Sequence, residues 1–101
     1  MPTDTALVIA GVPILQDDHG RYSLNTLHLA SGALATKRPG DWLRRSTTKA
    51  LIRELESQVV YLPLDVVHGG EGSGTYAHEL LAVSYAGWIS PAFQLRVNQA
   101  F

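Results

Sequence analysis

Cysteine is absent from the chain of 101 residues. Without thiols, disulfides, zinc–thiolate sites and thiol nucleophiles are all excluded, and the composition fits the cytosol. No stretch approaches the roughly 20 apolar residues of a membrane span. The first residues, MPTDTALVIAGVPILQDD, have neither the basic start nor the long apolar run of a signal peptide. We therefore expect a soluble, intracellular protein with no membrane partner.

Charged residues are also scarce, at 17% of the chain, and 46% of the residues are hydrophobic. These proportions predict a folded chain with its own core, and the length predicts one domain over residues 1–101. Positive charge is nearly missing outside residues 37–53. That segment holds six of the eight basic residues and one of the nine acidic ones, a net charge of +5 against −6 for the rest. The resulting field is polarised although the total is only −1.

The basic segment reads as two helices separated by a turn. Pro39 and Gly40 break the chain, Asp41 is a plausible N-cap, and Trp42 and Leu43 anchor a first short helix. The next stretch, STTKALIRELESQ, has the apolar period of an amphipathic helix. Its predicted inner stripe is Leu51, Ile52 and Leu55, which Thr48 could extend. This is a helix-turn-helix pattern.

The flanking segments predict strands and further helices. ALVIAGVPILQ reads as one broken strand or two short ones, the turn DDHG follows, and RYSL returns as the second strand of an N-terminal β-hairpin. Asn25 is the expected N-cap of a short helix that Gly32 ends.

Downstream, VVYLPL reads as a strand ended by Pro63, and glycines between Gly69 and Gly74 predict a hairpin with a flexible tip. HELLAVSYAGWI predicts a helix, with His78 at its start as a cap or a buried hydrogen-bonding residue. Ser90-Pro91 has the N-cap and N1 order of a final helix, whose Phe93, Val97 and Phe101 face the core.

No residue constellation indicates catalysis. GGEGSG lacks the Lys-Ser/Thr of a phosphate-binding loop, and the serines show no nucleophile-elbow spacing. The four histidines are scattered, with no i, i+4 pair of a zinc site. We therefore predict no enzyme activity, no metal and no cofactor.

The basic helix-turn-helix has two interpretations. A run of charge is often only a solvated helix face. Here, however, the charge is concentrated on one motif, and hydroxyl residues stand at the start of the second helix, where backbone N–H groups can approach a phosphate. This arrangement predicts binding to double-stranded DNA. The candidate contacts are Lys37, Arg38, Arg44, Arg45, Ser46, Thr47, Thr48, Lys49 and Arg53.

Three ordered motifs carry a family resemblance: GRYSLNTLHLAS, DWLRRSTTKALIRELES and GTYAHELLAVSYAGWISPAFQLRVNQAF. From about Gly20 to Phe101 the chain resembles the KilA-N domain of bacteriophages, bacteria and large DNA viruses, which is similar to the fungal APSES domain. The resemblance implies an α+β, winged helix-turn-helix-like fold with two C-terminal helices. It also implies DNA binding in a phage or prophage regulator, often of the antirepressor type, in the bacterial cytoplasm.

The resemblance has departures and leaves alternatives open. Glu79 stands where the family often has proline, and Thr26-Leu27-His28 replaces a common Ala-Thr-Lys. Because such domains usually precede another domain, the chain could be a piece of a longer protein. The alternative function is a protein-interaction module that binds a repressor, with the acidic remainder facing a basic partner. Its acidic candidates are Asp17, Asp18, Asp65 and Glu71. A homodimer is also open.

Overall fold

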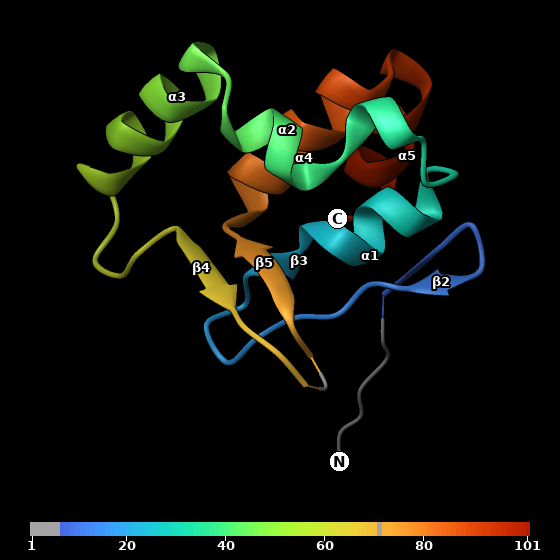
Figure 1. Ribbon diagram of the computed structural model, residues 1–101, viewed down its shortest axis with the longest axis horizontal. Coiled ribbons are helices and arrows are strands. Elements are labelled where there is room, and N and C mark those ends of the chain that lie inside the picture. Colours follow the sequence, from blue (N-terminus) through green and yellow to red (C-terminus); the bar gives the residue numbers. More distant parts are fainter. Residues whose placement is uncertain (1–6, 71) are drawn as a thin grey trace.

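The computed structural model describes residues 7–70 and 72–101, and its class is α+β, as predicted (Figure 1). The helices are α1 (Leu24–Ala30), α2 (Pro39–Leu43), α3 (Ser46–Glu56), α4 (Glu79–Ile89) and α5 (Pro91–Ala100), with a 3-10 turn, η1 (Ala35–Lys37). The strands are β1 (Val8–Ile9), β2 (Val12–Pro13), β3 (Tyr22–Ser23), β4 (Leu64–Val67) and β5 (Gly74–Ala77). The order therefore places a helix-turn-helix before a strand hairpin and two closing helices, a winged-helix-like arrangement.

The N-terminal hairpin turns earlier than the sequence predicted. β1 and β2 pair antiparallel, with Ile9 opposite Val12, and the chain reverses at Ala10 and Gly11, both with positive φ. The expected pairing of this region with the segment after DDHG is reduced to one bridge, between Gln16 and Tyr22. β3 instead joins the central sheet, because it pairs there with β5, a strand from much later in the sequence.

The central sheet has the strand order β3-β5-β4, with both pairings antiparallel. β4 and β5 form the predicted Gly-rich hairpin, which we call the wing. The strand predicted to end at Pro63 begins after it instead, at Leu64, and VVYL is loop. The register explains the shift: Leu64 pairs with Ala77, and the carbonyl of Pro63 accepts a hydrogen bond from the N–H of His78.

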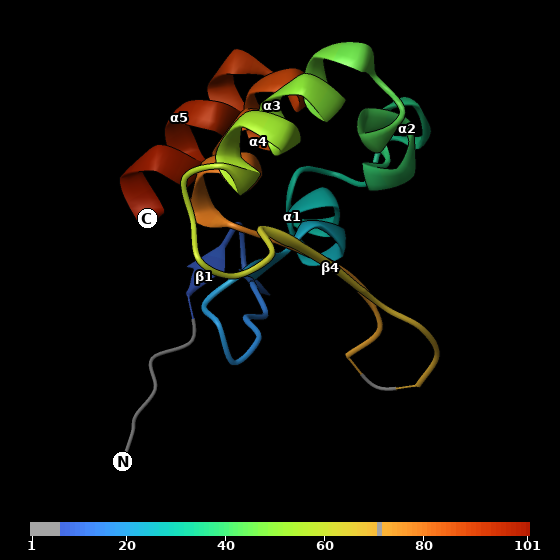
Figure 2. The same ribbon diagram turned by 90° about the vertical axis from the view of Figure 1, so that its left-hand side faces the viewer.

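The core lies between α1 and the two closing helices (Figure 2). Leu24, Leu27, Leu81, Tyr85 and Val97 are fully buried. The predicted stripe of α5 is confirmed, since Phe93 and Val97 are buried and Phe101 is partly buried against the same core. Trp42 packs beside Tyr85, with ring centroids 5.5 Å apart, and this contact seats the helix-turn-helix on α4.

The helix caps correct two predictions. Ser23, not Asn25, caps α1, because its Oγ accepts the N–H of Thr26. α2 begins at Pro39, so Asp41 lies in its first turn rather than at its N-cap.

The caps of the two closing helices are as predicted. His78 Nδ1 accepts the N–H of Leu80 at the start of α4. Ser90 Oγ accepts the N–H of Phe93 at the start of α5, where Pro91 occupies the first helical position.

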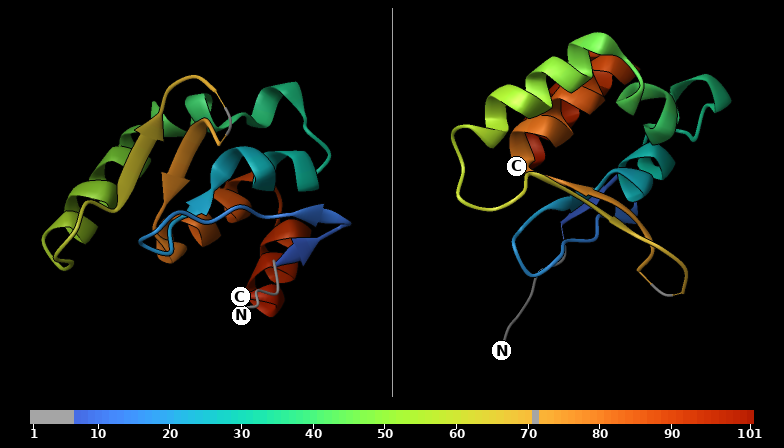
Figure 3. Two further views of the ribbon diagram at one scale, coloured as in Figure 1. Left: turned by 90° about the horizontal axis from the view of Figure 1, so that it is seen from below. Right: turned by 60° about the vertical axis from the view of Figure 1, so that its left-hand side comes forward.

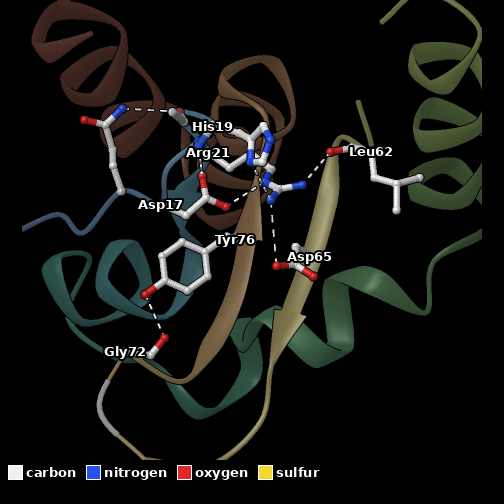
Figure 4. A network of polar contacts seen from close by, with 9 residues as sticks. Asp17, His19, Arg21, Leu62, Asp65, Gly72 and Tyr76 are labelled. Carbon is white, nitrogen blue, oxygen red and sulfur yellow. Dashed lines mark hydrogen bonds and ion pairs between the residues drawn. The ribbon is translucent and has the colours of Figure 1, made fainter. Parts of the chain in front are cut away.

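Arg21 ties the N-terminal turn to the wing (Figure 4). Its Nε pairs with Asp17 Oδ2 at 2.6 Å, its Nη1 donates to the carbonyl of Leu62 at 2.7 Å, and its Nη2 lies 3.7 Å from Asp65 Oδ2. The Arg21 side chain is buried, so these partners satisfy a charge withdrawn from water. Within residues 7–70 and 72–101, no helix is long and apolar enough to cross a membrane.

Candidate nucleic-acid interface

The inward face of α3 differs in one position from the predicted stripe. Thr48 is 3% exposed, Leu55 is buried and Ile52 is half-buried, whereas Leu51 is 38% exposed. Positions 48, 52 and 55 follow the i, i+4, i+7 spacing of one helical face. The outward face therefore carries Lys49 and Arg53, which are both exposed.

The structure separates the nine sequence-predicted contacts into three groups. Seven are exposed: Arg38, Arg44, Arg45, Ser46, Thr47, Lys49 and Arg53. Thr48 was a wrong choice as a surface contact, because its side chain belongs to the buried face of α3. Lys37 is half-buried at the end of η1, and its ammonium group is already engaged within the domain.

Trp88 on α4 forms a surface for two of the cations. The Nζ of Lys37 lies 4.5 Å from the Trp88 ring centroid and donates to the Trp88 carbonyl at 3.0 Å. The guanidinium of Arg45 lies 5.5 Å from the same centroid. A depression of about 390 Å³ opens here, lined also by Trp42 and Thr47. These cation–π contacts restrain two long side chains that would otherwise sample many rotamers.

The start of α3 is open to an anion. Its N-cap is Arg45, which makes no side-chain cap hydrogen bond, and no acid stands in the first turn. The partial positive charge of the helix N-terminus is therefore uncompensated by any side chain of that turn. Ser46 and Thr47 expose hydroxyl groups at the same point.

Two further arginines meet at one carboxylate. Arg44 Nη1 lies 2.7 Å from Asp41 Oδ1, and Arg38 Nε lies 3.5 Å from Asp41 Oδ2. The side chains of Arg38 and Arg44 nevertheless remain 64% and 77% exposed. Since ion pairs this exposed are weak, both guanidinium groups keep donors available to a ligand.

Tyr85 holds η1 in place beneath this surface. Its hydroxyl donates to the Lys37 carbonyl at 2.6 Å, although 48 residues separate the two. Burial, with a smaller contribution from the negative charge of Asp41, raises the pKa of Tyr85 far above its ordinary range, so the hydroxyl stays protonated and remains a donor.

The wing is fastened to α1 by Asn25. The Asn25 Oδ1 accepts the N–H of Thr75 at 2.8 Å, and a Cβ added to Gly74 would lie 2.5 Å from the same oxygen. Figure 3 (right) shows α1 between α2 and the wing. A groove of about 410 Å³ lies on this side, lined by Asn25, His28 and Thr75 and by the two arginines that flank α2, Arg38 and Arg44.

Sequence reasoning missed Asn25, Thr75, His28 and Trp88 as parts of this surface. An Asn near a helix start is ordinarily a cap, and nothing local reveals that its partner lies 50 residues away. No described residues form a cluster of three or more potential metal ligands among His, Cys, Asp and Glu.

Comparison with known proteins matches the sequence of this chain to a family model. The family model of the KilA-N domain matches residues 6–101. The chain is 56% identical over 100 residues to Protein kilA of Escherichia phage P1, an alignment that covers 99% of this chain and 37% of that protein. The chain thus spans well under half the length of this curated relative. No solved structure matches it.

Proposed function

The chain belongs to the KilA-N domain family, and from that premise we propose that it is a non-catalytic, DNA-binding domain of a phage or prophage regulator. Its ligand is duplex DNA, and its reading head is the helix-turn-helix of α2 and α3.

One observation carries the proposal: five exposed cations lie on two consecutive helices and the turns beside them, in a chain of net charge −1. They are Arg38, Arg44, Arg45, Lys49 and Arg53. A solvated helix face needs no such segregation of charge. The phosphate backbone of DNA strongly attracts such a patch of positive charge, because phosphates that are neutralised by the protein release their counterions.

The mechanism follows from the placement of each part. The open N-terminus of α3 and the hydroxyls of Ser46 and Thr47 suit a backbone phosphate. Lys49 and Arg53 are one helical turn apart on the exposed face, where a recognition helix presents side chains to the major groove. The wing supplies no lysine or arginine among its described residues, so its contribution would be through polar groups.

Charge reversal tests the proposal. The double variant Arg45→Glu/Lys49→Glu should lose at least about tenfold in affinity for a mixed-sequence duplex in an anisotropy titration. Arg96→Glu is the matched control, because Arg96 is exposed on α5, outside the helix-turn-helix. Equal affinity of the double variant and the wild type, with melting curves intact, would reject DNA binding through α3.

Selection of bound duplexes from a random pool tests specificity. An enriched motif is expected if Lys49 or Arg53 reads base edges, and a palindromic motif would indicate a dimer. Recovery of duplexes with no enriched motif would show that the domain contacts the DNA backbone without reading the base sequence.

The alternative, a module that binds a repressor, has less support from the described residues. Its acidic surface was to include Asp17 and Asp65, but both are directed at the buried Arg21. Asp18 remains exposed, and Glu71 lies outside the described residues. Capture of a purified phage repressor, together with no duplex affinity at low salt, would favour this function instead.

A further inference from the structure

The groove lined by α1, the wing and the residues in and beside α2 has one charged wall and one polar wall. Arg38, Asp41 and Arg44 form the charged wall, and Asn25, His28 and Thr75 form the other. The groove holds about 410 Å³ and is separate from the outer face of α3. Among the residues that the structure describes, Asp41 is the only acid that lines it.

The Asp41 carboxylate shows how the charged wall receives an anion. Each of its oxygens faces a different arginine, at 2.7 Å from Arg44 Nη1 and 3.5 Å from Arg38 Nε. The two guanidinium groups can thus converge on one anionic group with two acceptor oxygens. Two cations against one carboxylate leave a net charge of +1, and each guanidinium has donors beyond the one that faces Asp41.

The polar wall is ordered by contacts of its own. Asn25 bonds the backbone of Thr75, and the space beside Gly74 is filled by the Asn25 amide. On the same wall, His28 Nε2 is hydrogen-bonded to the Leu34 carbonyl at 2.7 Å, which fixes its ring. A wall that is already ordered needs little reorganisation when a ligand enters.

We propose that this groove binds one phosphodiester group of the DNA backbone, held by Arg38 and Arg44, in addition to the phosphates contacted by α3. Asp41 is the internal anion with which that phosphate competes. The phosphodiester supplies two non-bridging oxygens in place of the two carboxylate oxygens, and arginine pairs with such groups bidentately. This inference rests on the proposed function, because it assigns a second contact to the same ligand.

Salt-dependent anisotropy titrations of the whole chain with a mixed-sequence duplex test the groove. Arg38→Gln/Arg44→Gln should weaken binding about three- to tenfold. It should also make the negative slope of log K against log salt shallower by about 0.9, which corresponds to the loss of one phosphate contact. Asp41→Asn should tighten binding and make this slope steeper, because it frees both guanidinium groups. Arg96→Gln, exposed on α5, is the control and should leave the slope unchanged.

The outcomes separate the groove from the wider proposal. If the wild type fails to bind duplex at low salt, the proposed function itself is wrong. If the wild type binds and Lys49→Gln/Arg53→Gln weakens it, while Arg38→Gln/Arg44→Gln behaves as Arg96→Gln does, only the groove inference is overturned. Weaker binding by Asp41→Asn would also overturn it, because Asp41 would then support the interface rather than compete with the phosphate.

Discussion

The side-chain oxygen of Asn25 accepts a hydrogen bond from the backbone N–H of Thr75 at 2.8 Å. This single contact joins the first helix to the second strand of the wing, across 50 residues of chain. It leaves no room for a side chain at Gly74, whose φ of +135° also favours glycine. The Asn25 amide therefore helps to fix the wing against α1, together with the pairing of β5 with β3.

Replacing either partner of this contact should destabilise the domain. Asn25→Ala leaves the nearly buried N–H of Thr75 without an acceptor, at a cost of about 1–3 kcal/mol. Gly74→Ala brings a Cβ against the Asn25 amide and should cost a similar amount. Urea unfolding measures both.

The control for Gly74 is Gly70→Ala, since Gly70 also has a positive φ, +73°, but open space around it. A loss for Gly74→Ala no larger than that for Gly70→Ala would show that only the backbone conformation matters. In Asn25→Ala/Gly74→Ala the clash disappears, so the double variant should lose less stability than the two single losses added together.

Tyr85→Phe should lower the melting temperature and the free energy of unfolding by about 1–2 kcal/mol. The Lys37 carbonyl would lose the donor that fastens η1 to α4. Tyr76→Phe is the matched control, because the Tyr76 hydroxyl bonds the carbonyl of Gly72, which lies on an exposed part of the wing and can take a water instead. Equal losses in the two variants would contradict this account.

The same hydroxyl predicts a dependence of stability on high pH. Burial, aided by Asp41, raises the pKa of Tyr85 above its ordinary value. The unfolded chain then releases this proton first, near pH 10, so the stabilisation is complete below about pH 10 and declines as pH rises toward the native pKa. Unfolding free energies at increasing pH should fall more steeply for the wild type than for Tyr85→Phe. Parallel curves would contradict the prediction.

Asp17 predicts a dependence on low pH. Its burial acts to raise the pKa of its carboxyl, but hydrogen bonds from the Arg21 side chain and from the backbone N–H groups of Arg21 and His19 outweigh that effect, so the pKa is lowered. The stabilisation is therefore present above the unfolded value of about 3.9 and is lost as pH falls through the native pKa.

Asp17→Asn should accordingly cost about 1–3 kcal/mol near neutral pH, because a charge-assisted pair with a buried arginine is lost. The difference from wild type should shrink as pH falls below about 4. Asp18→Asn, at an exposed neighbouring position, is the control and should change stability little. A difference that stays constant down to acid pH would show that Asp17 acts without its charge.

Trp88 predicts a link between packing and binding. Trp88→Leu removes the ring beside Lys37 and Arg45, and its loss should weaken duplex binding about two- to threefold, the worth of about 0.5 kcal/mol of restraint at an exposed site. Trp88→Phe keeps a smaller ring, so its duplex affinity should lie between those of the wild type and Trp88→Leu. If Trp88→Leu lowers the melting temperature but leaves duplex affinity unchanged, the ring serves packing alone.

The sequence by itself determined the elements whose signals are local. The amphipathic period of α3, the capping order of Ser90 and Pro91, and the glycines of the wing can each be recognised from residues a few positions apart in the chain. The segregation of basic residues is likewise a property of the sequence, and it predicted the helix-turn-helix as the candidate interface.

The tertiary structure decided everything that depends on a distant partner. β3 pairs with β5 in the central sheet rather than with the N-terminal segment alone. Ser23 caps α1, and the Asn25 side chain accepts its hydrogen bond from Thr75 instead. Thr48 was buried because α3 turns that face toward the domain.

The groove has the same origin. Arg38 and Arg44 were predicted as separate contacts, and only the packing of α2, α1 and the wing places them along one groove with Asn25. Periodicity fixes which residues share a helical face, because neighbours in sequence set it. Which face meets which partner is fixed by long-range contacts, whose energies no local pattern contains.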